Sequence, residues 1–235
     1  TPIELVESEV PNEILRYGLA PDSGGAGRHR GGLGTWLEFK VFSPNTRITT
    51  RNRDRTRFRP WGVLSGCAGK SSNFILNPGT NREKILGNAD LLTAEPGDVI
   101  RFYGPGGGGR GSPLDRETDR VVQDVERGYV SVEAAKAEYG VVLTDGVVDE
   151  PGTAALRRGM QRHIDHFDFG PERTVYEKTW SREKYDDLTE ILMGLPVHWR
   201  FFVKSQIFDV LKNDEDANVR TAFDGILREH PQIAT

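Results

Sequence analysis

The chain has 235 residues, of which 28% are charged and 36% apolar, and it carries a formal net charge of −4. This composition is typical of a globular protein, and its acidic balance argues against a nucleic-acid partner. No apolar run approaches the ~18 residues that a membrane-spanning helix needs, and the single cysteine, Cys67, excludes an internal disulfide. We therefore expect a cytoplasmic protein with no membrane partner.

Charge and glycine content both change near the middle of the chain. Residues 1–111 carry a net charge of +4, and residues 112–235 carry −8. Three glycine clusters, at 23–27, 31–34 and 106–109, all lie in the first region. We predict an α+β fold, with a β-rich, glycine-looped region over 1–111 packed with a mainly helical region over 112–235.

Short segments of alternating polarity predict strands between the glycine clusters. Thr35–Phe42 mixes β-branched and aromatic residues, and Asp98–Tyr103 follows a Pro96-Gly97 turn signal. Phe74–Leu76 is a shorter apolar run. The first region is therefore predicted to be a sheet with long loops.

Helical periodicity and capping residues dominate the second region. Ser131 is a plausible N-cap for a helix over Val132–Tyr139, and Gly140 is placed to end it. Ser181 can likewise begin a helix that ends near Gly194. The other predicted helices are Asp115–Glu126, Thr153–Ile164, Val197–Leu211 and Val219–Leu227.

Arginine recurs at every second position from residue 51 to residue 59. In an extended strand all five side chains project to one face, where they repel one another unless anions, acidic residues or water surround them. The run is either a surface for an acidic partner subunit or a solvated strand or loop, and a phosphate or nucleic-acid surface is a third alternative. The partner-contact candidates are Arg51, Arg53, Arg55, Arg57 and Arg59.

The glycine clusters allow two interpretations. Backbone N–H groups in glycine-rich turns can hold anions or a developing oxyanion. Alternatively, the glycines mark tight chain crossings where any Cβ atom would clash. Four consecutive glycines carry a large ordering entropy, which favours a site or interface role for 106–109. The candidates for lining the substrate or oxyanion are Ser23, Gly24, Gly25, Arg28, His29, Arg30, Gly106, Gly107, Gly108 and Gly109.

One segment imitates a nucleotide-binding loop. Gly66–Ser71 ends like a P-loop, but Leu64 stands where that motif needs a glycine, and Asn73–Gly79 cannot supply the following helix. We therefore expect no ATP to bind there.

Metal and nucleophile signals are weak. His163 and His166 can share a helix face and are weak metal candidates, so no metal site is predicted with them. Cys67 has no histidine close in sequence, and Pro2 directly follows Thr1, so neither is a convincing nucleophile. Because the chain begins at Thr1 and not at a methionine, we expect a processed or longer polypeptide.

Three spaced blocks of the sequence resemble the hydantoinase B/oxoprolinase family. Their order and spacing agree with the family over roughly residues 1–150, which is more specific than any one glycine run. The segment from Phe167 to Trp199 resembles an extension found in some members. The blocks are Asp22–Gly34 (DSGGAGRHRGGLG), Gly104–Leu114 (GPGGGGRGSPL) and Tyr129–Leu143 (YVSVEAAKAEYGVVL).

The resemblance implies an enzyme complex. Members hydrolyse cyclic amides such as hydantoins, 5-oxoproline or lactams, and relatives carboxylate acetone or acetophenone. The family's A-type partner subunit uses ATP and Mg, and a divalent metal belongs to the B-type half upstream of these blocks. We expect this chain to be the C-terminal part of a B-type subunit of a cyclic-amide hydrolase, with a ketone carboxylase or a non-catalytic assembly module as alternatives. The implied partners are the A-type subunit, the upstream half and a small carbonyl substrate.

Overall fold

The computed structural model of the chain describes residues 2–50, 55–87, 91–160 and 165–234. It divides the chain into two compact units, Thr1–Gly170 and Pro171–Thr235. Antiparallel sheets fill the early part of the first unit, and helices dominate after it. The predicted α+β fold is confirmed, and the change from strands to helices after Gly111 falls inside the first unit.

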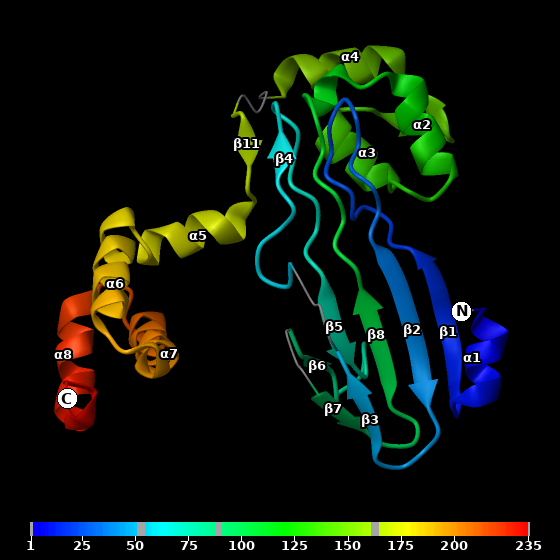
Figure 1. Cartoon of the computed structure of the whole chain (residues 1–235). Helices are drawn as coiled ribbons and strands as arrows, with labels where there is room; N and C mark the ends of the chain where they lie inside the picture. The colour runs from blue at the N-terminus through cyan, green and yellow to red at the C-terminus, as the bar shows by residue number, and fades with distance from the viewer. Residues whose placement is uncertain (1, 51–54, 88–90, 161–164, 235) are drawn as a thin grey trace. The chain divides into compact units, whose positions relative to one another are not determined.

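A five-stranded antiparallel sheet forms one end of the first unit (Figure 1). The sequence predicted β2, β5 and β8, which lie side by side, but it missed β1 and the preceding helix α1 (Ile3–Glu9). Across the sheet, the strands are β1 (Asn12–Leu19), β2 (Thr35–Val41), β8 (Val99–Tyr103), β5 (Asn73–Leu76) and β6 (Lys84–Ile85).

One face of this sheet packs against a two-stranded ladder. The ladder pairs β3 (Thr46–Thr49) with β7 (Leu91–Ala94). Because side chains alternate along a strand, Val41, Phe74 and Ile100 point to the same face, and each is at most 2% exposed. This apolar core fixes the register of the sheet, since a one-residue slip would turn its side chains to the other face.

The helical part of the first unit follows a short 3₁₀ helix, η1 (Pro113–Asp115). The predicted caps are confirmed: the Ser131 side chain accepts a hydrogen bond from the Ala134 N–H at 3.0 Å, and Gly140 has a φ of 63°. The helix predicted to reach Ile164 ends at Gly159, and 161–164 lie outside the described residues. The elements are α2 (Thr118–Glu126), α3 (Val132–Tyr139), β9 (Leu143–Thr144), β10 (Val147–Val148) and α4 (Glu150–Gly159).

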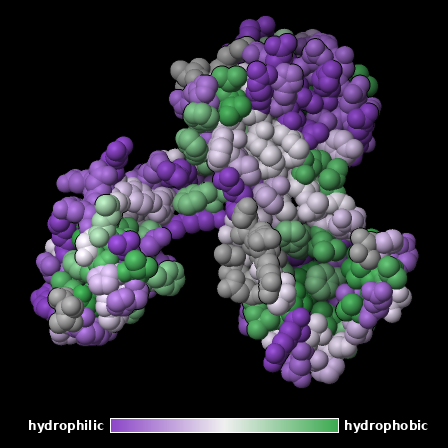
Figure 2. All heavy atoms as spheres, viewed as in Figure 1, coloured by the Kyte–Doolittle hydropathy of each residue, from purple (hydrophilic) through white to green (hydrophobic). Residues whose placement is uncertain are grey.

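Three extended glycine-rich segments connect the sheet to these helices (Figure 1). They are residues 23–34, 62–70 and 104–111, and we refer to them together as the glycine layer. In Figure 2 they form a pale band between the hydrophilic helices and the greener sheet. A short ladder of β4 (Gly62–Val63) and β11 (Phe167–Asp168) extends the layer.

The second unit is helical. The sequence missed α5 but predicted the other helices, and the Ser181 side chain caps α6 as expected. The face of α7 that is buried carries Val203, Ile207 and Leu211, while Val197 and Phe201 are 76% and 80% exposed. The elements are α5 (Pro171–Thr179), α6 (Arg182–Gly194), α7 (Val197–Asn213), α8 (Val219–Glu229) and η2 (Pro231–Ala234). Within the described residues, no helix is long and apolar enough to cross a membrane.

Candidate functional site

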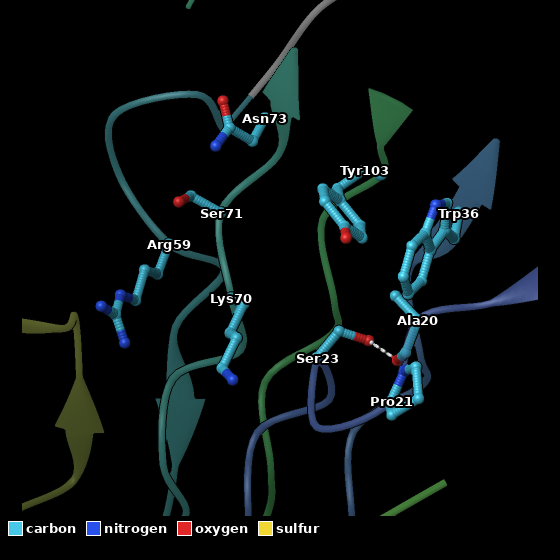
Figure 3. A pocket seen from close by; sticks show the side chains of 10 residues that line it. Ala20, Pro21, Ser23, Trp36, Arg59, Lys70, Ser71, Asn73 and Tyr103 are labelled. Atoms are coloured by element: carbon cyan, nitrogen blue, oxygen red, sulfur yellow. Dashed lines mark hydrogen bonds between the residues drawn. The ribbon is translucent and has the colours of Figure 1, made fainter. Parts of the chain in front are cut away.

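A cavity of about 450 Å³ lies where the five-stranded sheet meets the glycine layer (Figure 3). Ala20, Pro21 and Ser23 line it from the start of the layer, and Gly104 lines it from the end of β8. Its volume falls within the range of small-molecule sites. The cavity is therefore the candidate functional site of this chain.

Two aromatic rings form one wall of the cavity. Trp36 of β2 and Tyr103 of β8 are paired across neighbouring strands, with ring centroids 5.0 Å apart. The Arg16 guanidinium lies 3.5 Å from the centroid of the Trp36 ring, on the sheet face that carries both rings. The aromatic wall is therefore held by cross-strand packing and by a cation–π contact.

A partly buried carboxylate orients the Trp36 ring. The Glu38 side chain accepts hydrogen bonds from the Trp36 indole N–H, at 3.3 Å, and from Arg101. Burial alone would raise the pKa of Glu38, but these hydrogen bonds and the charges of Arg101 and Arg16 outweigh it, so the pKa is lowered. Glu38 therefore stays ionised and keeps the ring in one orientation.

The opposite wall of the cavity is polar. Lys70 and Ser71 line it from the chain that leads into β5, Asn73 lines it from the start of β5, and Arg59 adds a second cation (Figure 3). Among the described residues that line the cavity there is no aspartate or glutamate. The cavity thus combines an aromatic wall with a positively charged wall, and the sequence singled out only Ser23 and Arg59 among these residues.

Ser23 was a predicted substrate-lining residue, and it does line the cavity. Its hydroxyl donates to the Ala20 carbonyl oxygen at 2.6 Å and accepts from the Gly34 N–H at 2.8 Å. The side chain is only 5% exposed. Ser23 therefore fastens the two ends of the first glycine segment, and its hydroxyl proton is donated to a backbone carbonyl and not to a base.

The predicted glycines pack backbone against backbone. The Gly25 N–H donates to the Gly107 carbonyl and the Gly107 N–H to the Gly32 carbonyl, each at 2.8 Å, and the Gly109 N–H donates to the Cys67 carbonyl at 2.9 Å. A Cβ atom would lie within 3.0 Å of backbone atoms at most of these positions, which favours the tight-crossing interpretation. The predicted glycines with such a contact are Gly24, Gly25, Gly106, Gly108 and Gly109, and Gly31 has one as well.

The charged residues after the first cluster point elsewhere. Arg28 and His29 line a smaller cavity of about 140 Å³, beside Arg116 and Glu117. Arg30 forms an ion pair with Asp124 of α2 at 3.1 Å. A single stretch of sequence therefore serves three different places, and direct contact of Arg28, His29 and Arg30 with a substrate stays a prediction.

The Asp124 carboxylate joins the glycine layer to the helices. It accepts from Arg30, and from Arg116 at 2.8 Å, while Arg116 also donates to the Arg28 carbonyl at 3.0 Å. The Asp124 side chain is 8% exposed. Arg157 extends the network by donating to the carbonyls of Arg116 and Tyr139, at 2.9 and 3.0 Å.

Where the structure describes it, the arginine run forms a loop and not a strand. Arg55 has a φ of 59° and lies over the Trp61 ring, 4.9 Å from its centroid. Arg57 lies 5.3 Å from the centroid of the Phe58 ring, and Arg59 lines the cavity. Arg51 and Arg53 lie outside the described residues, and partner contact by the run stays a prediction.

The residues that resembled a nucleotide-binding loop belong to the glycine layer. Lys70 is followed by strand β5 and not by the helix that a P-loop requires. Burial raises the pKa of the Cys67 thiol to about 11, with further contributions from Asp168 and Glu138, so the thiol is protonated at neutral pH.

The described residues do not fit a metal ion. Over 2–50, 55–87, 91–160 and 165–234, no three His, Cys, Asp or Glu side chains are grouped as a metal site would need. The His166 ring packs edge-on against Phe167, with centroids 4.4 Å apart. His163, the other weak candidate, lies outside the described residues.

The fold and the cavity define an α+β protein with a small-molecule-sized site at a glycine layer. Residues 1–113 match the family described as hydantoinase B/oxoprolinase, and the chain belongs to this family. Every residue named above as lining the larger cavity lies within the matched range. The resemblance drawn from the three sequence blocks is confirmed.

Two curated relatives are similar over about two thirds of this chain. The beta subunit of the caprolactamase of Pseudomonas jessenii is 39% identical over 165 residues, which are 66% of this chain and 27% of the relative. The B-type subunit of a putative D-/L-hydantoinase from a Pseudomonas species, strain NS671, is 32% identical over 160 residues, which are 67% of this chain and 27% of the relative. The chain thus spans little more than a quarter of these relatives.

Two solved structures share the fold. The ATP-dependent caprolactamase from Pseudomonas jessenii matches with a TM-score of 0.51 and 34% identity, over 67% of this chain and 28% of that chain. A nucleotide-free acetone carboxylase matches with a TM-score of 0.55 over 100% of this chain and 32% of that chain. The latter is 22% identical, so this match concerns the fold alone.

Proposed function

We propose that this chain is part of an ATP-dependent hydrolase that opens small cyclic amides. The observation that carries the proposal is that this chain is 39% and 32% identical to subunits of two hydrolases of ring amides. The candidate cavity lies within the residues that match the family. In such a reaction water adds to the ring carbonyl and the C–N bond breaks, which leaves a carboxylate and an amine, or a carboxylate and a ureido group when the ring is a hydantoin.

In this proposal the chain shapes the site and other parts of the complex supply the reacting groups. Trp36 and Tyr103 offer a flat apolar wall, and Lys70 and Ser71 offer donors to polar groups of the ligand. The Ser23 hydroxyl is engaged with Ala20 and Gly34, and the Cys67 thiol is protonated. The nucleophile is therefore assigned to the rest of the complex.

The partners follow from the same proposal. An A-type subunit would bind ATP and Mg and activate the substrate, and the rest of the B-type subunit would hold a divalent metal. Arg55 and Arg57 are proposed contacts to an acidic partner surface. We place the complex in the cytoplasm, where Cys67 stays reduced.

Ketone carboxylation is the second candidate. An acetone carboxylase structure shares the fold over the whole chain, including the helices after Gly170. A non-catalytic assembly module is the third, because the glycine layer is packed backbone against backbone. The two enzyme candidates differ in their substrates. The assembly module differs from both because its role would not depend on the residues that line the cavity.

The test uses the intact complex and measures ATP hydrolysis. Hydantoin, 5-oxoproline and caprolactam are compared with acetone plus bicarbonate. Stimulation by a cyclic amide supports the proposal, whereas stimulation only by the ketone favours the carboxylase. If neither class stimulates ATP hydrolysis, both enzyme candidates fail.

A matched pair of variants separates a site from an assembly module. Trp36→Leu removes a ring from the cavity, and Tyr17→Leu changes a 64% exposed residue on the opposite face of the sheet. A site role predicts that Trp36→Leu lowers kcat/KM by about tenfold or more in an intact complex, while Tyr17→Leu does not. Equal effects of the two variants, or loss of assembly with Trp36→Leu alone, would favour the module.

A further inference from the structure

The charge of the larger cavity is one-sided. Two cationic side chains, Arg59 and Lys70, line it, and none of the described residues that line it is acidic. The smaller cavity differs, because Asp115 and Glu117 line it together with its arginines. The larger cavity therefore favours an anionic ligand over a neutral one.

Lys70 is fixed at the base of its side chain. Its N–H donates to the Ser23 carbonyl at 2.8 Å, and its own carbonyl accepts from the Gly106 N–H at 3.0 Å. The two bonds join Lys70 to the other two segments of the glycine layer, which have little freedom to move because their backbones are in contact. The point from which the Lys70 side chain extends is consequently fixed beside the cavity that this residue lines.

The Lys70 ammonium makes no hydrogen bond or ion pair with the part of the chain that the structure describes. Glu138 of α3 interacts with its charge electrostatically but does not line the cavity. A ligand anion can therefore reach the ammonium without first displacing an internal carboxylate.

We propose that this cavity binds a small carboxylate that carries a planar or short apolar group. The carboxylate lies beside the Lys70 ammonium and the Ser71 hydroxyl, and the apolar group lies against Trp36 and Tyr103. The proposal goes beyond the function proposed above, because it concerns binding by this chain whichever reaction the complex performs. A volume of about 450 Å³ accommodates a single-ring acid together with water.

The selectivity has a physical cause. A neutral amide of the same shape can use the aromatic wall but leaves the ammonium group without a counter-charge. Hydrogen bonds with an ionised partner are about twice as strong as neutral ones, so the acid is expected to bind about tenfold more tightly than its amide. Because Lys70 is exposed, salt will screen the attraction and reduce this preference.

The experiment titrates the full 235-residue chain with benzoate and with benzamide by calorimetry. We expect benzoate to bind about tenfold more tightly at low salt, with a smaller preference at about 0.5 M salt. Lys70→Met should abolish the preference, whereas Lys40→Met on β2, which is outside the cavity, should preserve it. Lys70→Arg should also preserve it, because the positive charge remains.

The Trp36 ring provides a second readout. Trp36→Leu should weaken both ligands to a similar degree, because both use the aromatic wall. Equal binding of benzoate and benzamide, no benzoate binding at all, or an unchanged preference in Lys70→Met would each overturn the proposal. If Lys70→Met does not fold, two other variants test the proposal. Loss of the benzoate preference in Lys70→Arg, or binding of both ligands that is not weakened in Trp36→Leu, would then overturn it.

The two proposals fail in different ways. If the chain binds benzoate but no substrate stimulates ATP hydrolysis by the complex, the carboxylate-site proposal stands and the hydrolase proposal fails. If the complex turns over a cyclic amide but the chain shows no preference for the carboxylate, the hydrolase proposal stands and the carboxylate-site proposal fails.

Discussion

The carbonyl oxygen of Ser23 lies where a Cβ atom on Gly106 would have to be. The separation would be under 3.0 Å, and the obstructing atoms belong to the backbone, which cannot turn aside as a side chain can. The two residues are far apart in the sequence, so Gly106 and the Ser23 carbonyl meet only in the folded chain.

Replacing Gly106 by alanine should therefore destabilise the first unit strongly. We expect a loss of about 3 kcal/mol or more in the free energy of unfolding, because overpacking forces the backbone apart. Gly32→Ala is the matched control, because no atom lies within 4 Å of the place its Cβ would take, and its expected change is within about 0.5 kcal/mol. Urea unfolding followed by circular dichroism measures both, and equal stabilities would contradict the tight crossing.

The ion network around Asp124 should be a second determinant of stability. Asp124→Ala leaves the guanidinium groups of Arg30 and Arg116 without their carboxylate in a buried place. Breaking a buried pair in this way costs about 3–5 kcal/mol. Asp119→Ala on the same helix removes an exposed carboxylate and should cost under about 1 kcal/mol. A small loss for Asp124→Ala in urea unfolding would show that the network adds little.

The Cys67 thiol should react slowly in the folded chain. Because burial raises its pKa to about 11, few thiolates form at about pH 8, and alkylation should be roughly 100-fold slower than in the unfolded chain. The rate should then rise with pH until about pH 11. Since Cys67 is the only cysteine, mass spectrometry after iodoacetamide treatment reads the rate directly. Equal rates in folded and urea-unfolded chain would disprove the shift.

Asp98 should make the free energy of unfolding depend on pH in the acidic range. The hydrogen bond from the Glu95 N–H, with those from Asn77 and Arg82, lowers its pKa against the effect of burial. A lowered folded pKa means that Asp98 stabilises the fold above its ordinary pKa of about 3.9, and that this contribution disappears as the pH falls through the folded value.

The comparison of wild type with Asp98→Asn tests this sign. The difference in unfolding free energy should be constant between about pH 7 and pH 5 and should shrink below about pH 4. A difference that grows as the pH falls would reverse the assignment.

The arginines on the loop before the cavity should matter for partner binding. Arg55→Gln with Arg57→Gln is expected to weaken binding of the proposed A-type partner subunit about tenfold at low salt, with little effect at about 0.5 M salt. Arg182→Gln, which changes a 94% exposed side chain in the second unit, is the control. Surface plasmon resonance measures both variants, and unchanged binding at low salt would remove this contact.

The sequence predicted those helices and strands whose formation depends mainly on neighbouring residues in the chain. Ser131 and Gly140 bracket α3, as their capping preferences predict. The alternating pattern of Thr35–Phe42 became β2 because one set of its side chains is buried in the sheet core. Where the local signal was weak, as in β1 and α5, neither periodicity nor capping residues predicted an element.

The candidate site was harder to predict, because its residues come from separate strands. Trp36 and Tyr103 meet through strand pairing, and Lys70 reaches them only because the glycine layer brings its segment alongside Ser23. The residues of the first glycine block, which are adjacent in sequence, were expected to act together. They instead serve a cavity, a smaller cavity and an ion network.

The sequence by itself determined the family, the α+β class and most helices, because these depend on spaced motifs and on local periodicity. Only the tertiary structure decided what the glycines do. Whether a glycine N–H faces a ligand or a carbonyl depends on which segments lie beside it, and here the neighbours of Gly25, Gly107 and Gly109 are other backbones. The same packing placed the aromatic and cationic walls of the cavity opposite each other, since each wall is built from residues that the chain brings together from a distance.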